Sequence, residues 1–415
     1  MRLQTLVLAI LCALAALELI ARGPARALRH QGAGDFAAPY AAARAWASGE
    51  DPYNQRALAV ILRDQGRERD AEGRVLFTAS VYPPMTFPIV SPFAWPPWKA
   101  ARALWTTLLV LAAAGLAWGA ARLAGLQDDA RLAVIAAVLA LAPLHTGISR
   151  GQPGIVAIAL IAWALVSLDS DTGMRSGVML GLAAALKPQL AAPFILYLLL
   201  TGRRNAFTWC GLVAGSALVA GIGWLAMHDV PWWDGWLRNI RLENHGGEMD
   251  PAGALSSQMI DVRPLLHALR IPDPLSGSIV LAVMLGAIAI VLARGATDVL
   301  LVTSTVAVWT LLVGYHRFYD GALLALPVAW AIRELARGAA RAVPWGVLAL
   351  TAPFLIPGAW MLQLAAERGV VPGWLATSWF FDVVALRHQI WALFAMHAVL
   401  LIALAGRRSG HARPR

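Results

Sequence analysis

Residues 34–53 read GDFAAPYAAARAWASGEDPY and follow the first hydrophobic segment of the chain. This stretch places one carboxylate, Asp35, just beyond the apolar run at 3–20 and at the start of a long polar loop. A carboxylate that emerges from a membrane anchor into a loop is the first candidate for chemistry in this sequence. The other polar residues are therefore considered for whether they could serve Asp35.

The alanine-rich segment after Asp35 carries helix boundary signals. Pro39 stands near its beginning and Gly49 just past its end, which predicts a short helix over 37–48. Tyr40 and Trp46 suit a helix that lies at a membrane surface, because amphipathic aromatic rings settle there. Such a helix would hold the preceding carboxylate close to the bilayer.

The composition indicates a membrane protein with many spans. Of 415 residues, 59% are hydrophobic and 14% are charged, and the mean hydropathy is +0.62, which is too apolar for a soluble protein of this length. A spanning helix needs about 20 mostly apolar residues. We therefore predict an all-α polytopic membrane protein, one integral-membrane domain over 1–415, with about twelve transmembrane helices. The apolar blocks are 3–20, 103–124, 132–148, 154–168, 176–186, 189–200, 206–227, 277–293, 297–313, 321–336, 343–362 and 388–405.

Two parts of this assignment have alternatives. The short blocks that meet at Lys187 and Pro188 form either one broken span or two tilted spans. The N-terminus also resembles a secretory signal, with Arg2, an apolar core and a cleavage pattern at 25–27. Glu18 inside the apolar run and the polytopic remainder favour a retained anchor.

Basic residues set the orientation. Short loops on the cytoplasmic side are expected to carry the excess of arginine and lysine, and this places both termini in the cytoplasm and the long loops, near 21–100 and 228–276, outside. The net charge of +10 is then a topological and lipid-surface signal, with no nucleic-acid partner implied. The inside segments hold Arg2, Arg122, Arg131, Arg175, Arg203, Arg204, Arg294, Arg333, Arg337, Arg341, Arg407, Arg408, Arg413 and Arg415, and the short outside loops hold Arg150, Lys187, Arg317, Arg368 and Arg387.

Two outer segments are rich in aromatic residues. The stretch VYPPMTFPIVSPFAWPPWK at 81–99 contains six prolines, which remove backbone donors, so we predict no regular helix there. Its apolar residues favour a re-entrant or surface-lying segment that shapes a groove, with Tyr82, Pro83 and Pro84 at its start. In the second loop, Trp232, Trp233 and Trp236 are expected along one side of a short interfacial helix.

Several signatures of other protein classes are absent from the sequence. There is no Walker phosphate loop, no GxGxxG and no HExxH, which argues against nucleotide-driven pumps and zinc peptidases of the usual kind. Cys12 and Cys210 lie in apolar spans, so a disulfide framework is not expected. Asp169 and Asp171 have a spacing used for metal binding in sugar-nucleotide transferases, but a tight cytoplasmic turn favours a solvated helix cap.

Asp35 could act as a catalytic base. Moving a sugar from a lipid phosphate to a hydroxyl requires that a proton leave the acceptor, and one carboxylate suffices because a phosphate departs without being protonated. Glycoside hydrolysis would need a second carboxyl group as acid. The competing interpretation is that Asp35 is only a polar residue at the membrane interface.

Basic groups at the outer face could stabilise a departing phosphate through charge-assisted hydrogen bonds. For the arginines the alternative is snorkelling to lipid headgroups, whereas an ionisable group at membrane depth, Lys187, is a functional candidate by default. His316 and Asp320 lie four apart and would share a helix face, either as a mutually satisfied pair or as part of a site. The candidates are Arg150, Lys187, His316 and Arg317.

Taken together, these residues resemble glycosyltransferase family 87, whose best understood members are polyprenol-phosphate-mannose-dependent alpha-mannosyltransferases. The resemblance rests on the order of several short motifs along one predicted membrane face. These motifs are Gly34-Asp35 with Tyr40 and Trp46, Asp51-Pro52-Tyr53, Tyr82-Pro83-Pro84, Gly151-Gln152, Lys187-Pro188 and Tyr319-Asp320.

The resemblance implies a GT-C fold, Asp35 as the base, inversion at the anomeric carbon and a lipid-linked donor reached from the outer side. Gln152, Tyr319 and Asp320 are then expected to contact substrate. This chain departs from the family at Pro153 and Gly154, where an asparagine is usual, and this leaves the acceptor and the donor sugar open.

The leading hypothesis is an enzyme of the bacterial cytoplasmic membrane that moves a hexose, mannose by resemblance, from a polyprenyl phosphate to a lipid or glycan acceptor. A lipid or solute transporter or flippase is the main alternative, and a structural partner in envelope synthesis is a third. Discontinuous helices and two-half symmetry would favour a transporter. No cofactor or dedicated metal is expected, because the outer loops show no tight cluster of carboxylate and histidine ligands; a divalent cation at the phosphate is an open alternative.

Overall fold

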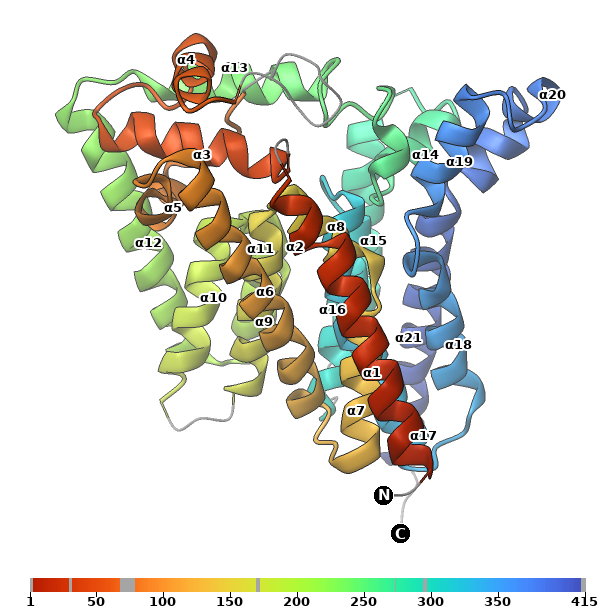
Figure 1. The fold of residues 1–415 in the computed structure, drawn as a ribbon. Helices are drawn as coiled ribbons and strands as arrows, with labels where there is room; N and C mark the ends of the chain where they lie inside the picture. The colour runs from red at the N-terminus through yellow and green to blue at the C-terminus, as the bar shows by residue number, and fades with distance from the viewer. Residues whose placement is uncertain are drawn as a thin grey trace. The chain divides into compact units, whose positions relative to one another are not determined.

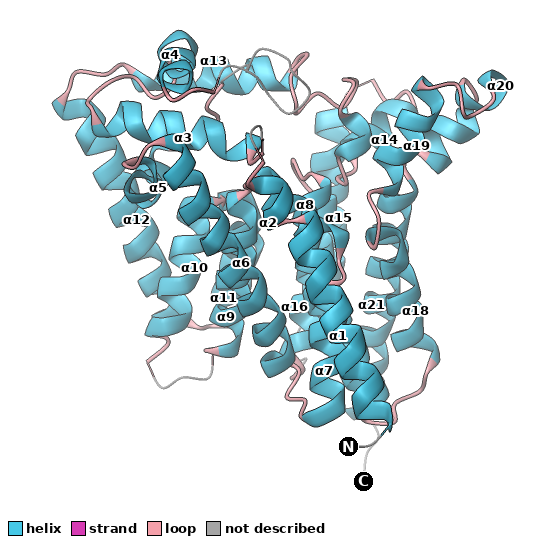
Figure 2. Cartoon of the chain, in the orientation of Figure 1, coloured by secondary structure: helices cyan, strands magenta, loops and turns pink. Residues whose placement is uncertain are grey.

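The computed structural model describes residues 3–29, 32–67, 79–168, 172–272, 274–293 and 297–411. Over these ranges the chain is helical, and they contain no β-strand (Figure 2). The all-α class is therefore confirmed. Two extended segments, which meet at Met259 and Arg317, form an isolated antiparallel bridge.

Among the described residues, five helical stretches are long and apolar enough to cross a membrane, or six if α7 Asp128–Leu139 and α8 Ala142–Arg150 together form one span. The predicted count of about twelve is not confirmed. Several predicted spans form helices of 10–17 residues, shorter than the roughly 20 residues that cross a bilayer unaided. The five are Leu3–Ala27, Trp98–Leu123, Arg204–Met227, Ala342–Glu367 and His388–Gly406, and the shorter apolar helices include Pro153–Val166, Met174–Leu186, Pro188–Leu200, Gly277–Val291 and Val299–Leu312.

The chain folds into two compact units (Figure 1). Unit 2 comprises Ala16–Gly119 and Leu144–Gly247, and unit 1 comprises Met1–Ala15, Ala120–Pro143 and Glu248–Arg415. Unit 2 holds α2 Pro24–Ala27, α3 Gly34–Ala47, α4 Gln55–Asp64, η1 Pro84–Thr86, α5 Phe87–Ala94, most of α6 Trp98–Leu123, most of α8 Ala142–Arg150, α9 Pro153–Val166, α10 Met174–Leu186, α11 Pro188–Leu200, α12 Arg204–Met227 and α13 Trp232–Asn244.

Helix α10 forms the centre of unit 2, between α9 and α12. Gly177 and Gly181 are four residues apart and face α12, and a side chain at either would collide with it. A Cβ at Gly177 would lie 2.3 Å from the carbonyl oxygen of Ala206, and one at Gly181 would lie 2.7 Å from Cβ of Val213. This small-xxx-small pattern lets two backbones approach closely in a membrane helix pair.

The proline-rich segment contains a helix, so that prediction was wrong. Helix α5 runs over Phe87–Ala94, and it packs against α3. Pro88 stands in its first turn, where the missing N–H would have no partner anyway. Pro92 cannot donate to the carbonyl of Pro88, but the Ser91 hydroxyl donates to that carbonyl at 3.3 Å. Two prolines are therefore compatible with one short helix.

The expected helix at the second outer loop is present as α13. The indole N–H of Trp236 donates to the carbonyl of Val81 at 3.0 Å. The buried Asn239 amide donates to the carbonyls of Tyr53 and Ser80, both at 3.1 Å, and accepts from Gln55 at 2.8 Å. The Asn239 side chain therefore joins α13 to the segment 53–55 and to Ser80.

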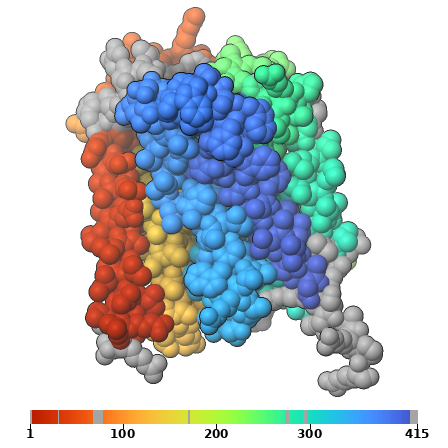
Figure 3. Space-filling model, turned by 90° about the vertical axis from the view of Figure 1, so that its right-hand side faces the viewer, coloured from red at the N-terminus to blue at the C-terminus, as the bar shows by residue number. Residues whose placement is uncertain are grey.

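Unit 1 is built on α16, α17, α18 and α21, which pack on one another. Figure 3 shows α18 and α21, in blue, side by side on one face. Thr303, Thr305 and Thr310 of α16 are buried. Each hydroxyl donates to the carbonyl four residues earlier, which satisfies it inside the core. The unit holds α7 Asp128–Leu139, η2 Ser256–Gln258, α14 Arg263–Ala268, α15 Pro274–Ala293, α16 Val299–Leu312, η3 Phe318–Leu324, α17 Ala325–Ala336, α18 Ala342–Thr351, η4 Ala352–Phe354, α19 Gly358–Glu367, α20 Gly373–Ala376, η5 Phe381–Ala385, α21 His388–His411 and the first part of α1 Leu3–Arg22.

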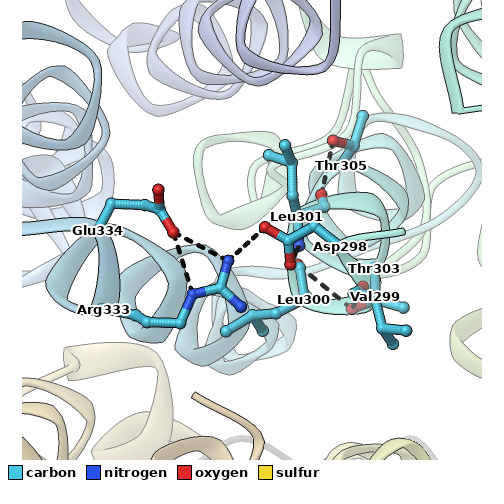
Figure 4. A network of polar contacts seen from close by, with 8 residues as sticks. All are labelled: Asp298, Val299, Leu300, Leu301, Thr303, Thr305, Arg333 and Glu334. Carbon is cyan, nitrogen blue, oxygen red and sulfur yellow. Dashed lines mark hydrogen bonds and ion pairs between the residues drawn. The ribbon is translucent and has the colours of Figure 1, made fainter. Parts of the chain in front are cut away.

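A buried ion network joins the start of α16 to α17. Arg333 contacts both Asp298, which caps α16, and Glu334, whose Oε1 lies 3.0 Å from Nη2 of Arg333 (Figure 4). Asp298 also accepts from the backbone N–H of Leu301 at 3.2 Å. The guanidinium therefore fixes the ends of two neighbouring helices through opposite charges.

Candidate active site

Asp35 lies in the first turn of α3, which begins at Gly34, three residues before the start that the sequence indicated. Its side chain is half-buried, and Oδ2 accepts a hydrogen bond from Nε2 of Gln152 at 2.5 Å. Among the described residues Asp35 has no ion-pair partner and Oδ1 accepts no hydrogen bond. The carboxylate is thus held by one oxygen, and the other remains available to accept a proton.

The turn between α8 and α9 brings Gln152 to Asp35. Gly151 adopts φ +79° in this turn, and a Cβ there would lie 2.8 Å from Cβ of Phe36. The indole of Trp105 donates to the carbonyl of Gly151 at 2.8 Å, and the N–H of Ala33 donates to the carbonyl of Ser149 at 3.1 Å. The start of α3 is therefore fitted directly onto this turn.

Aromatic rings fix the buried side of α3. The ring of Phe36 stacks on Trp105 with centroids 4.6 Å apart, and the ring of Tyr40 meets Trp98 edge-on at 5.2 Å. The fully buried Tyr40 hydroxyl donates to the carbonyl of Pro96 at 3.0 Å, which makes it part of the support of the helix. Burial raises the pKa of Tyr40 and Arg44 lowers it, with burial the larger effect.

Two buried arginines beside the start of α3 were missed by sequence reasoning. Arg67 is almost fully buried, donates to the carbonyl of Gly32 at 2.9 Å and lies over the ring of Trp98 at 4.6 Å. Arg102 of α6 donates to the carbonyls of Leu28, at 3.1 Å, and Arg29. Arg67 belongs to the strongly charged stretch at 63–74, and no pattern in this stretch signals burial.

The YPP segment and Lys187 come together in unit 2. The Tyr53 hydroxyl donates to the carbonyl of Tyr82 at 2.9 Å, and the Thr86 hydroxyl donates to the carbonyl of Ala185 at 2.8 Å. Lys187 follows two residues later, buried, at a non-helical residue between α10 and α11. The two short apolar blocks thus form two separate helices, α10 and α11, which are divided at Lys187. Pro83 is half-buried and Pro84 is buried.

Asp51 and Tyr53 of the DPY motif are shielded from solvent. Burial raises the pKa of the Asp51 carboxyl, while the backbone N–H of Tyr53 and the charge of Arg238 lower it. Burial, and to a lesser extent the Asp51 carboxylate, raise the pKa of Tyr53. Tyr53 therefore remains a protonated donor that anchors the YPP segment.

The second polar cluster lies in unit 1. Nδ1 of the buried His316 is 3.1 Å from Oδ2 of Asp320, and the backbone N–H of His316 donates to Asp261 at 3.1 Å. Arg317 pairs with Glu248 at 2.5 Å and donates to Gln258 at 2.6 Å. The ring of Tyr319 lies 5.8 Å from the Arg317 guanidinium.

This arrangement leaves one nitrogen of His316 without a partner. Nε2 is buried and makes no hydrogen bond to the described residues. Asp320 at Nδ1 favours the tautomer with the proton on that nitrogen, which makes Nε2 an acceptor when the ring is neutral and a donor when it is protonated. Pairing with Asp320 therefore satisfies Nδ1 of His316 but gives no partner to Nε2.

The structure distributes the predicted site residues between the two units. Asp35 and Gln152 are in direct contact. Arg150 ends α8 next to this pair and is half-buried, with no ion-pair partner among the described residues. The residues in unit 2 are Asp35, Tyr40, Tyr82, Pro83, Pro84, Arg150, Gln152 and Lys187, and those in unit 1 are His316, Arg317, Tyr319 and Asp320.

Residues 81–314, more than half of the chain, match glycosyltransferase family 87. The chain belongs to glycosyltransferase family 87. No curated protein and no solved structure matches it. The part that matches the family contains Tyr82, Arg150, Gln152 and Lys187, whereas Asp35 precedes it and the cluster at 316–320 follows it.

Family 87 membership makes the protein a membrane glycosyltransferase, which needs a sugar donor and an acceptor. Its apolar helices fit a membrane protein. Within the described ranges, no group of three or more His, Cys, Asp and Glu side chains is placed to hold a metal ion. The spaced pair Asp169 and Asp171 lies outside the described residues.

Gly151→Ala is expected to disturb this family 87 site. Alanine at φ +79° costs about 1–3 kcal/mol in backbone strain, and its Cβ would also press on Phe36 at 2.8 Å. The unfolding temperature in detergent should fall, and sugar transfer should weaken because Gln152 would move relative to Asp35.

Gly66→Ala is the matched control for this variant. Gly66 has a similar φ of +73°, but no heavy atom lies within 4 Å of the position of a Cβ. Gly66→Ala therefore introduces a similar backbone strain without a steric clash of the added Cβ. If both variants unfold at the same temperature, the close packing of the turn on α3 does not stabilise the site.

Proposed function

We propose that the protein transfers mannose from a polyprenyl phosphate to a lipid or glycan acceptor, at the outer face of the bacterial cytoplasmic membrane. On this proposal the fold is of the GT-C type, and the reaction inverts the anomeric carbon. The long loops near 21–100 and 228–276 lie outside. The end of α21 and the start of α1, at the same end of unit 1 in Figure 1, lie in the cytoplasm.

Asp35 is the general base in this reaction. Its carboxylate takes the proton of the acceptor hydroxyl as that oxygen forms a bond to the anomeric carbon. The bond between the anomeric carbon and the phosphate oxygen breaks, and polyprenyl phosphate leaves with the bonding electrons. A positioned base contributes about 10²- to 10⁴-fold to such a step.

The observation that carries this proposal is the contact between Asp35 and Gln152. It joins the carboxylate to a residue within the segment that matches the family, although 117 positions separate the two. The hydrogen bond orients one oxygen, and Oδ1 has no partner among the described residues. This is the arrangement that a base needs: one oxygen anchored and one open.

Cationic groups would stabilise the phosphate that departs. Lys187 and Arg150 of unit 2 serve this role. Arg317 of unit 1 is already paired with Glu248 and Gln258. The other predicted substrate contacts of unit 1, His316, Tyr319 and Asp320, belong to the same cluster as Arg317.

The test is transfer by the purified protein in lipid nanodiscs. Polyprenyl-phosphate-linked [14C]mannose, the corresponding glucose donor and a nucleotide-linked mannose are each supplied with an extract of envelope lipids and glycans. Label is expected in the extract from the lipid-linked mannose alone. Transfer from the nucleotide sugar would overturn the donor assignment. Movement of the lipid-linked sugar across the bilayer without transfer would favour the transporter or flippase.

A further inference from the structure

Unit 1 contains a cavity that none of the proposed catalytic groups uses. It has a volume of about 440 Å³, within the range of small-molecule sites. It lies where the end of α14 meets η5, at the end of unit 1 opposite to the chain termini (Figure 1). The lining residues are His267, Ala268, Arg270, Ile271, Pro272 and Asp382.

The charges around this cavity favour an anion. Arg270 is exposed and has no ion-pair partner among the described residues, and His267 stands in the last turn of α14. Among the described lining residues the one carboxylate, Asp382, is paired with Arg387, with Oδ1 and Nη2 3.2 Å apart. Arg270 lines the cavity and Arg387 pairs with Asp382 from behind it, so among the described residues two guanidinium groups accompany one carboxylate and the excess charge is positive.

Arg387 has unused hydrogen-bonding capacity behind Asp382. The residue is only 5% exposed, and its Nε and Nη1 make no hydrogen bond to the described residues. Its Nη2 contacts Asp382 and, at 3.5 Å, the Ser256 hydroxyl. A buried guanidinium with unpaired N–H groups is costly, and oxyanions are the ligands that satisfy several such groups at once.

Apolar side chains are exposed beside this charged cavity. Ile271 of the lining is 41% exposed, and Trp379 and Phe380, three and two residues before Asp382 in the chain, are 65% and 54% exposed. Aromatic residues of this kind gather where headgroups meet acyl chains. The combination of an anion site and an apolar border fits a phosphate that carries a hydrocarbon chain.

We propose that the cavity between α14 and η5 binds the phosphate ester of a membrane lipid, with Arg270 and Arg387 as its cationic ligands. Asp382 is half-exposed, with 50% of its side chain accessible, and it occupies Arg387 when no lipid is bound. Lipid binding here needs no sugar transfer, so this inference stands or falls separately from the proposed reaction.

Native mass spectrometry of the full-length protein in detergent tests the site. Phosphatidylglycerol, polyprenyl phosphate, phosphatidylcholine and inorganic phosphate are titrated separately. The two anionic lipids are expected to bind more tightly than phosphatidylcholine. Because polyprenyl phosphate is also the product at the proposed active site, the natural headgroup is the one whose binding Arg270→Ala weakens more. Equal binding of phosphatidylcholine would overturn the proposal, and so would displacement of the lipids by an equal concentration of inorganic phosphate.

Two variants assign the residues. Arg270→Ala should weaken anionic lipid binding about tenfold, whereas Arg368→Ala, an exposed arginine just after α19, should not. Asp382→Asn should instead strengthen binding several-fold, because it removes a competing carboxylate from Arg387. An ion pair with only a structural role predicts unchanged or weaker binding in Asp382→Asn, and that result would overturn the role of Arg387.

Discussion

Asp35→Asn is expected to lower the rate of sugar transfer by about 10²-fold or more, with the fold intact. An asparagine amide has the same shape as the carboxylate, and its oxygen can still accept from Gln152 at the position of Oδ2. It cannot take a proton from the acceptor hydroxyl. The rate is measured as initial transfer of [14C]mannose in nanodiscs, at saturating donor.

The competing role of Asp35 is structural, because an acidic residue in the first turn of a helix interacts favourably with the helix dipole. That interaction is worth only about 0.3–1 kcal/mol at an exposed site, so its loss lowers the unfolding temperature slightly and does not remove catalysis. Unfolding temperature and transfer rate measured on the same sample separate the two roles.

Glu50→Gln is the matched control for this experiment. Glu50 is an exposed carboxylate that follows the other end of α3, and its neutralisation removes the same charge without touching Gln152. We expect the wild-type rate. If Asp35→Asn and Glu50→Gln both transfer sugar at the wild-type rate, Asp35 is not the base.

The sequence indicated the two partners in the Asp35 contact but could not join them. Asp35 follows an apolar span and Gln152 lies in a polar turn, so each stood out as a polar group at a membrane boundary. Their hydrogen bond depends on Gly151, whose φ of +79° brings the turn against Phe36. A backbone conformation of this kind is a tertiary feature with no periodic signal.

Local rules were less reliable where tertiary packing decides the outcome. Six prolines predicted an irregular segment, but Pro88 and Pro92 fall at positions that the helix over 87–94 tolerates. The span count relied on apolar length, and broken blocks such as the pair joined at Lys187 form helices too short to count alone. The burial of Arg67 could not be predicted either, because a strongly charged stretch gives no sign that one of its arginines is buried.

Arg333 shows the same limit. In the sequence it contributed only to the cytoplasmic excess of basic residues, because Asp298 lies 35 positions earlier and belongs to another predicted span. In the structure the two side chains are 7% and 9% exposed and in contact, and Glu334 adds a second carboxylate that is 11% exposed. Arg333, which was counted only as a basic residue that sets the membrane orientation, is therefore also part of the core of unit 1.

Arg333→Ala is expected to lower the free energy of unfolding by about 3–5 kcal/mol, because removing one partner leaves buried charge uncompensated. Here two carboxylates, Asp298 and Glu334, would remain at low exposure without the guanidinium (Figure 4). The ends of α16 and α17 should separate first, since the network joins them. Unfolding is followed by titration with sodium dodecyl sulfate in mixed micelles.

Two further variants show whether charge or packing is responsible. Arg337→Ala removes an exposed arginine one turn further along the chain and should leave the unfolding free energy within about 0.5 kcal/mol of wild type. The triple variant Arg333→Ala, Asp298→Asn, Glu334→Gln leaves the same space empty but removes all three charges and keeps a capping residue at the start of α16, so it should recover much of the loss. If Arg333→Ala unfolds like Arg337→Ala, the buried carboxylates do not depend on the guanidinium. If the triple variant is no more stable than Arg333→Ala, the loss comes from the missing side-chain volume, and the electrostatic account is wrong.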